Sequence, residues 1–219
     1  MPRTRRPDID TVYNAVLNVL PALDATDRAL SLALYRELAR GAAAAPASLA
    51  ARLDIPVADV VGRLRGWPGV YYDGGGQVVG YWGLALARTP HRLRIDGREL
   101  YAWCAWDTLF LPALLGARAE VASDCRGSGE PVRLTVDPGA VVSADPAGLL
   151  VSFLLPDPHA VQADPITRFC HYVHFFSSPE AAEPWLAEHP ETFLMSLADA
   201  YEVGQRRNQA RYGTNRNLD

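Results

Sequence analysis

Short apolar segments separated by turn residues dominate the second half of the chain and restrict its fold class. Between residues 118 and 176 these segments read RAEVAS, PVRLTV, AVVSA, LLVSFLL and FCHYVHFF, and each is typical of a short strand. Two helical segments follow them, PEAAEPWLAEH and LADAYEVGQRRNQARYG. Strands mixed with flanking helices predict an α+β fold, with short and mainly antiparallel strands.

The first part of the chain has a helical pattern instead. The expected elements are helices over residues 11–22 and 26–41, a short helix, a third helix ending near residue 66 and a β-hairpin over residues 70–86. Thr26 is a candidate N-cap of the second helix. This order is typical of a winged helix-turn-helix. We therefore expect a winged-helix-like helical domain over residues 1–87 and a mixed domain over residues 88–219.

A winged helix suggests DNA binding, but the charge distribution disfavours it. Residues 1–87 hold nine Arg against eight Asp plus Glu, and the third helix offers only Arg63 and Arg65. Binding to the phosphate backbone needs a clearly basic face. We expect this region to pack against or cover a site, with no nucleic acid as partner.

Composition narrows the function further. The chain has 219 residues, of which 49% are hydrophobic, and its net charge is −4, so neither nucleic acid nor an anionic membrane is indicated. All 21 basic residues are Arg, which excludes a lysine Schiff base. No run approaches the roughly 18 apolar residues of a membrane span, and no signal-peptide pattern follows the N-terminus. We expect a cytoplasmic protein whose three cysteines are free thiols, metal ligands or nucleophiles and not a disulfide framework.

The segment LYAWCAWDTL, residues 100–109, carries the first candidate site. Asp96 and Glu99 have the spacing of a capping box, which predicts a helix from near Gly97. One stripe of that helix would hold Leu100, Cys104, Asp107, Leu111 and Leu114. A buried carboxyl either finds donors or keeps its proton, and a protonated carboxyl can act as a general acid. The alternative is a small core cysteine beside an aspartate that caps a loop or meets an arginine.

The other two cysteines give weaker signals. Cys170 lies in a predicted strand over residues 167–176, whose alternation puts His171 and His174 on opposite faces, a poor chelating pair. Cys104 and Cys170 could form a two-thiolate site for a soft metal, although spacing alone does not show that they meet. Cys125 lies in a loop without a C-x-x-C partner, which favours a structural role. The motifs of other enzyme classes are absent, so cysteine chemistry is the main candidate.

Two blocks of this sequence resemble the organomercurial lyases (alkylmercury lyases). They are TPHRLRIDGRELYAWCAWDTLFLPALLG and FCHYVHFFSSPEAAEPWLAEHP, in that order after a winged-helix-like region. The resemblance implies an enzyme that cleaves carbon–mercury bonds by protonolysis, giving a hydrocarbon and Hg(II). It implies Cys104, Asp107 and Cys170 as the catalytic trio, with both thiols holding the product Hg(II) transiently. It also implies that Trp103 and Phe169 line the substrate pocket, that Cys125 is structural and that residues 88–219 form the catalytic domain.

The chemistry of the residues agrees with that resemblance. Thiolates are good ligands for soft mercury, and a nearby carboxylic acid, protonated by burial or by a thiol, can deliver a proton to carbon. No cofactor is expected. Small thiols, or a partner with its own thiols such as mercuric reductase, would remove Hg(II). Two departures stand out: His171 follows Cys170, and Trp106 is bulkier than the aliphatic residue expected between Cys104 and Asp107.

Two other hypotheses remain open at this point. One is a non-catalytic or repurposed relative that binds soft metals through its two thiols. The other is a winged-helix regulator whose thiols sense metal, which the charge count disfavours.

Overall fold

The computed structural model describes residues 6–213 and has an α+β fold, as predicted. The helices are α1 (Ile9–Val19), α2 (Ala25–Leu38), α3 (Pro46–Leu53), α4 (Val57–Gly66), α5 (Asp107–Leu115), α6 (Pro158–Ala163), α7 (Pro165–Arg168), the 3₁₀ turn η1 (Cys170–Tyr172), α8 (Pro179–Glu188) and α9 (Leu197–Tyr212). The strands are β1 (Val70–Tyr72), β2 (Val78–Tyr81), β3 (Leu84–Ala85), β4 (His91–Ile95), β5 (Arg98–Ala102), β6 (Ala119–Asp124), β7 (Pro131–Asp137), β8 (Ala140–Asp145), β9 (Leu150–Leu154), β10 (Phe175–Phe176) and β11 (Thr192–Ser196).

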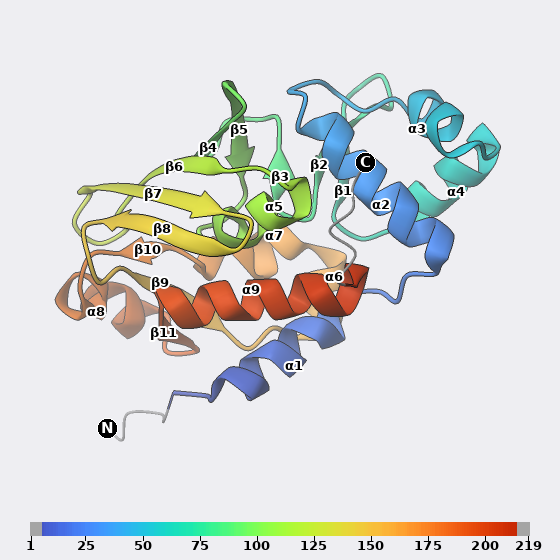
Figure 1. Ribbon diagram of the computed structural model, residues 1–219. Helices are drawn as coiled ribbons and strands as arrows, with labels where there is room; N and C mark the ends of the chain where they lie inside the picture. Colours follow the sequence, from blue (N-terminus) through green and yellow to red (C-terminus); the bar gives the residue numbers. More distant parts are fainter. Residues whose placement is uncertain (1–5, 214–219) are drawn as a thin grey trace.

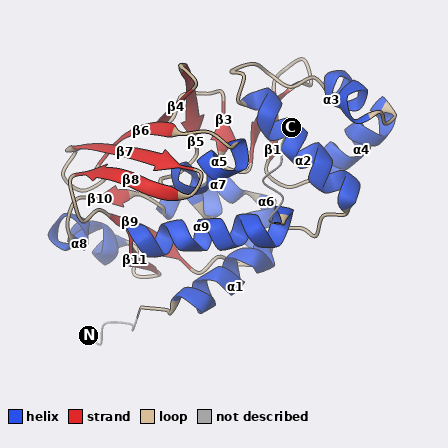
Figure 2. Cartoon of the chain, viewed as in Figure 1, coloured by secondary structure: helices blue, strands red, loops and turns tan. Residues whose placement is uncertain are grey.

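The strands of the described part of the chain form two antiparallel sheets. The larger sheet has the order β1-β2-β3-β5-β4-β6-β7-β8, and the smaller has the order β10-β9-β11. Because β3 pairs with β5, the larger sheet runs without a break across residue 87, and the N-terminal hairpin belongs to the same sheet as the strands that follow. Figure 2 shows the helices distributed around these sheets.

The N-terminal helices form because each begins at a good cap and buries one apolar stripe. The side chain of Asp8 caps α1, which buries Val12, Val16 and Val19. Asp24 caps α2 through a reciprocal capping box with Asp27, so the N-cap lies two residues before the predicted Thr26. In Figure 1, α2, α3 and α4 gather at one end of the molecule, while α1 lies along α9.

The predicted helix from Gly97 is wrong in its first half. Residues 98–102 form strand β5, paired with β4 through a tight turn at Asp96 and Gly97, both of which have positive φ. The alternation of β4, with Leu93 buried and Arg94 exposed, decides the pairing because it matches a half-buried sheet and not a helix. Helix α5 begins only at Asp107, and Cys104 lies in the turn between β5 and α5.

The predicted strand over residues 167–176 is also mostly wrong. Residues 165–168 form helix α7, which starts with Pro165 at its first turn and the capping side chain of Asp164. Cys170 opens the 3₁₀ turn η1, and only Phe175–Phe176 form a strand. The capping side chain of Asp164 and the proline after it favour a helix here, although the apolar residues that follow alternate as they would in a strand.

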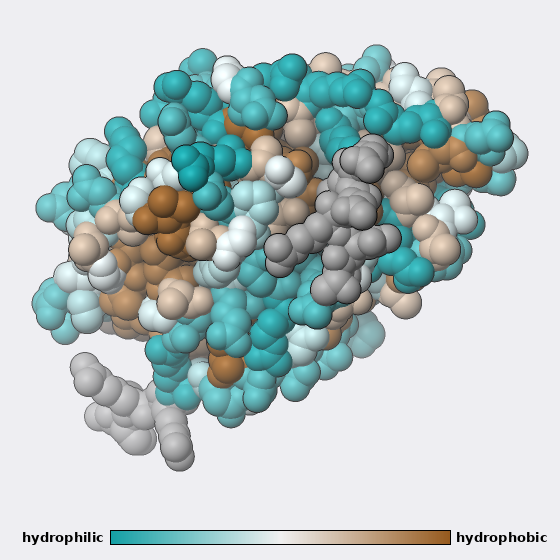
Figure 3. Space-filling model, viewed as in Figure 1, coloured by the Kyte–Doolittle hydropathy of each residue, from teal (hydrophilic) through white to brown (hydrophobic). Residues whose placement is uncertain are grey.

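Apolar residues fill the space between the sheets and the helices, where they form one connected core. The face shown in Figure 3 is mainly hydrophilic, with apolar side chains gathered over the region of β7 and β8 and a smaller group over the α3 and α4 end. Val142 of β8 is among the exposed large hydrophobic residues. The candidate site lies inside the molecule, at the point where the core meets the helices α1, α5 and α9.

Candidate active site

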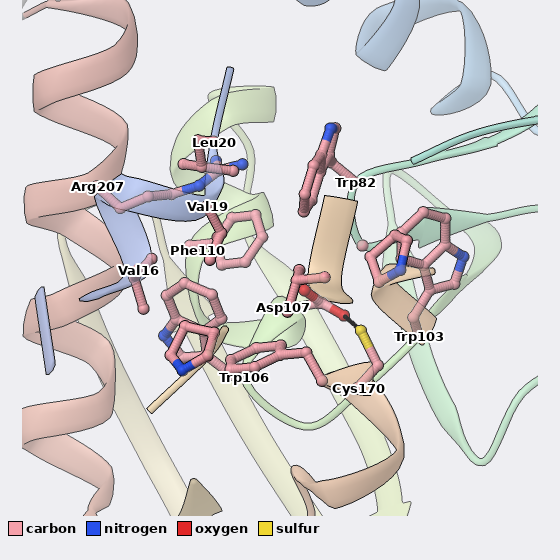
Figure 4. A pocket seen from close by; sticks show the side chains of 15 residues that line it. Val16, Val19, Leu20, Trp82, Trp103, Trp106, Asp107, Phe110, Cys170 and Arg207 are labelled. Carbon is pink, nitrogen blue, oxygen red and sulfur yellow. Dashed lines mark hydrogen bonds between the residues drawn. The ribbon is translucent and has the colours of Figure 1, made fainter. Parts of the chain in front are cut away.

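The structure brings Cys104, Asp107 and Cys170 together. One ligand atom from each of these residues lies within 4.8 Å of the others, and all three residues are buried. The thiol of Cys170 points at the carboxyl of Asp107, with 4.0 Å between Sγ and Oδ2 (Figure 4). In residues 6–213 this is the only cluster of three His, Cys, Asp or Glu side chains with the geometry of a metal site.

Local hydrogen bonds fix the Cys104 turn and the start of α5. The backbone N–H of Cys104 donates to Oδ2 of Asp107 at 2.8 Å, so the carboxyl closes the turn that carries the thiol. The hydroxyl of Thr108 donates to the carbonyl of Ala105 at 2.7 Å. The spacing of three residues between thiol and carboxyl therefore places them together, although through a turn and not along a helix.

Two further backbone bonds tie this turn to distant segments. The N–H of Trp103 donates to the carbonyl of Gly83 at 2.9 Å, and the N–H of Ala105 donates to the carbonyl of Val173 at 3.2 Å. The second bond holds the turn against the segment that follows Cys170. Sequence spacing could not show this approach, because the two cysteines lie on opposite sides of four strands along the chain.

Burial and the contacts among the three residues shift all three pKa values. Burial raises the pKa of Asp107 to about 6, against the opposing effects of hydrogen bonds from Cys104 and of the charge of Arg207. Burial, followed by the neighbouring Cys170 and Asp107, raises the pKa of Cys104 well above its ordinary range. A hydrogen bond with Cys104 lowers the pKa of Cys170, but burial and the Asp107 charge outweigh it and raise the pKa. At pH 7 the site thus holds two thiols and a largely ionised carboxyl.

A small, mainly apolar cavity of about 30 Å³ opens beside the trio, and part of the site is open to solvent. Trp103 and Phe169, the two residues that the resemblance assigns to the pocket, both line it. The remaining lining residues are Val16, Val19, Leu20, Trp82, Gly83, Trp106, Asp107, Phe110, Pro156, Val161, Pro165, Cys170 and Arg207. Figure 4 shows Arg207 and Asp107 at different ends of this cavity, with Phe110 between them.

Several of these residues were missed by the sequence analysis. Trp82 and Gly83 come from the turn between β2 and β3, and Val19 comes from α1. A Cβ at Gly83 would lie 2.6 Å from Oδ1 of Asp107, and Gly83 has φ +99°, so only glycine fits there. No motif marked these positions, since their role depends on the packing of distant segments.

Trp106 forms part of the cavity wall and of the surrounding aromatic core. Its Nε1–H donates to the carbonyl of Ala200 on α9 at 2.9 Å. Its ring meets Phe110, Phe153 and Phe169 edge to face, with centroids 4.9, 5.4 and 6.0 Å away. The bulky residue between Cys104 and Asp107 therefore narrows the cavity and joins α5 to α9.

Cys125 lies outside this cluster. Its Sγ accepts hydrogen bonds from the backbone N–H of Ser128 at 3.4 Å and of Ser177 at 3.3 Å. Burial raises the pKa of Cys125, but these hydrogen bonds outweigh it and lower the pKa to about 7. The sulfur thus joins the β6–β7 turn to the end of β10. His171 and His174 also lie outside the cluster, and Nε2 of His174 lies 2.8 Å from the carbonyl oxygen of His171.

The fold and the site define a class of protein in which two buried thiols and one carboxyl have the geometry of a site for a soft metal ion, beside an apolar cavity. A family model described as alkylmercury lyase matches residues 84–208. The chain is 47% identical to the alkylmercury lyase of Staphylococcus epidermidis over 172 residues, which are 78% of each chain. It is 42% identical to that of Streptomyces lividans over 173 residues, again 78% of each.

A solved structure gives the same result. The mercury-bound form of MerB2 superposes with a TM-score of 0.72 at 27% identity, covering 91% of this chain and 98% of that one. The chain belongs to the alkylmercury lyase family, and the prediction that it is an alkylmercury lyase is confirmed.

Proposed function

We propose that this chain cleaves the carbon–mercury bond of organomercury compounds by protonolysis, releasing a hydrocarbon and leaving Hg(II) on Cys104 and Cys170. The observation that carries the proposal is the buried cluster of two thiols and one carboxyl, whose ligand atoms lie within 4.8 Å of one another. Thiols suit a soft metal, and the carboxyl lies where it can exchange a proton with them.

The first step is thiol exchange at mercury. An organomercury cation enters as the adduct of a small thiol, and the sulfur of Cys104 replaces that thiol. A mercury–sulfur bond to Cys104 forms, the bond to the small thiol breaks, and the proton of Cys104 leaves with the departing thiol. The apolar cavity receives the organic group, because its walls are chiefly aromatic and aliphatic.

The second step delivers the proton to carbon. Cys170 passes its proton to the Asp107 carboxylate, 4.0 Å away, and the resulting thiolate binds mercury. Two sulfur donors place negative charge on the carbon. Asp107 then gives the proton to that carbon while the carbon–mercury bond breaks, so the electron pair of that bond forms the new carbon–hydrogen bond. The products are the hydrocarbon, Hg(II) on two sulfurs and an ionised Asp107.

Product release needs further thiols. We propose that small thiols remove Hg(II) by exchange, that mercuric reductase can receive it, and that no organic cofactor or resident metal takes part. Such exchange suits the cytoplasm, where thiols stay reduced. In residues 6–213, no helix is both long and apolar enough to cross a membrane.

The N-terminal region, residues 1–87, has a separate role in this proposal. We describe it as a winged-helix-like domain that does not bind DNA, preceding a catalytic domain over residues 88–219. The order of elements from α2 to β2, three helices followed by a hairpin, supports this description of the N-terminal region. Val19 of α1 and Trp82 contribute to the cavity wall, so this region helps to exclude water from the reacting carbon.

The test is release of benzene from phenylmercury with excess small thiol. Wild-type enzyme should release it, while Cys104→Ser and Cys170→Ser should each lose most of the activity. Cys125→Ser is the matched control, because the Cys125 sulfur lies outside the cluster and accepts hydrogen bonds from Ser128 and Ser177. The folded Cys125→Ser variant should keep its turnover. Tight binding of Hg(II) without any benzene release would instead identify a metal-binding relative.

A further inference from the structure

Within residues 6–213, one permanent cation lines the cavity; its charge lowers the pKa of Asp107, but the cleavage steps proposed above give it no contact with the substrate. Arg207 of α9 lines the cavity, and the residue is only 2% exposed. An arginine stays protonated at any pH at which the protein is folded. Taking such a charge out of water is costly unless an anion accompanies it.

No carboxylate of residues 6–213 pairs with this guanidinium within 4.0 Å. Its Nη1 donates to Oδ1 of Asn208 at 2.9 Å, and its central carbon lies 4.4 Å from the centroid of the Phe110 ring. The guanidinium also has a side-chain hydrogen bond with Tyr35. The phenols of Tyr35, Tyr212 and Tyr81 are the other groups that act on it most strongly, and they are neutral near pH 7. By contrast, the adjacent Arg206 is paired with Asp10 at 2.7 Å.

The position of Arg207 within the cavity decides what an anion there would belong to. Asp107 and Cys170 mark the end at which carbon and mercury react, and Arg207 marks another end, beyond the Phe110 ring (Figure 4). Between them the walls are apolar, including Trp82 and Val19. An organic group that fills this space from the mercury end carries its most distant substituent toward Arg207.

We propose that Arg207 makes this site selective for organomercury compounds whose organic group carries an anionic substituent, such as a carboxylate, far from the mercury atom. The proposal rests on the carbon–mercury cleavage proposed above. A planar guanidinium binds a carboxylate through two parallel hydrogen bonds, and the apolar surroundings strengthen that interaction. An arylmercury with a para-carboxylate has the required shape, a flat apolar body with a charged far end.

The experiment compares two substrates of nearly equal size, 4-carboxyphenylmercury and the neutral 4-carbamoylphenylmercury, both supplied as adducts of 2-mercaptoethanol. Liquid chromatography measures the benzoate and benzamide released. Wild-type enzyme should show a kcat/KM about tenfold or more higher for the carboxylate, the size expected for a charged hydrogen bond. In Arg207→Met, this ratio should fall to about one or below.

Arg206→Met is the matched control, since it removes the neighbouring surface charge and should keep the wild-type ratio. The ratio is measured within one sample, so a loss of folded enzyme cancels. If Arg207→Met gives no folded protein, Arg207→Gln replaces it, because glutamine keeps a polar head toward Asn208.

Two results would overturn the proposal: a wild-type ratio near one, or an unchanged ratio in the Arg207 variant. Either would make Arg207 a structural cation. Absence of all turnover, including that of unsubstituted phenylmercury, would instead contradict the cleavage reaction itself, so the two failures are distinguishable.

Discussion

The Sγ of Cys170 lies 4.0 Å from Oδ2 of Asp107, although 63 residues separate them along the chain. The same oxygen accepts the backbone N–H of Cys104. One carboxylate oxygen therefore faces both the turn that carries the first thiol and the side chain of the second. This relationship explains how a single group can take a proton from sulfur and deliver it to carbon.

The pH dependence of the reaction should follow Asp107. Burial raises the pKa of Asp107 to about 6, so the carboxylate that accepts the thiol proton forms as the pH rises through that value. We expect kcat/KM for phenylmercury to increase from about pH 5 to about pH 7, with a midpoint near 6. Initial rates of benzene release check this. A profile that decreases over the same range would mean that Asp107 must be protonated before the substrate binds.

The same burial should cost stability. In the folded protein the pKa of Asp107 is about 6, above the ordinary aspartate value of 3.8, so the fold binds the proton more tightly than the unfolded chain does. The stability contribution of this group therefore falls as the pH rises between these values. Asp107→Asn should be more stable than wild type at pH 7, by about 3 kcal/mol, and should lose that advantage near pH 4. Urea unfolding at both pH values measures this difference, and an equal difference at both would contradict it.

Gly83→Ala should disturb Asp107 directly. The added Cβ would lie 2.6 Å from Oδ1 of Asp107, at a residue with φ +99°. We expect at least a tenfold loss of kcat, together with a stability loss of about 1–3 kcal/mol. Gly97→Ala is the matched control, because Gly97 also has positive φ but meets no atom within 4 Å. Equal stability losses in Gly83→Ala and Gly97→Ala, with no loss of kcat in either variant, would contradict this prediction.

Trp106→Leu should widen the cavity. Trp106 lines it beside Phe110 and Phe169, so a smaller side chain leaves room for larger organic groups. We expect kcat/KM for a naphthylmercury to rise relative to that for methylmercury, with a stability loss of about 3 kcal/mol. Trp185→Leu should lose stability without changing this ratio, since Trp185 is buried outside the cavity. An unchanged ratio in Trp106→Leu would show that the ring does not limit substrate size.

The sequence predicted the fold class and the residues of the cluster better than their local structure. The three-residue spacing of Cys104 and Asp107 and their aromatic surroundings were visible, but the segment from residue 98 to 102 is a strand. Its pairing with β4 outweighs the capping-box spacing of Asp96 and Glu99. Local propensity is a weak guide where a sheet buries one face.

The residues that complete the cavity could not be predicted because they depend on long-range packing. Gly83 looked like part of a hairpin, and Arg207 lies in a polar segment, RRNQAR, that is typical of an exposed helix face. Only the contact of α9 with α5, which holds Asn208 against the Phe110 carbonyl at 3.0 Å, shows that this face is buried.

The most direct test of the central claim is a single turnover in which the hydrocarbon and the bound mercury are measured together. Phenylmercury is mixed with an excess of enzyme without added small thiol, and benzene in the headspace and mercury on the protein are quantified. Wild-type enzyme should release one benzene for each mercury retained. Asp107→Asn should retain the mercury as phenylmercury and release benzene at least about a hundredfold more slowly. Benzene release at the wild-type rate from Asp107→Asn would contradict the assignment of Asp107 as the proton donor.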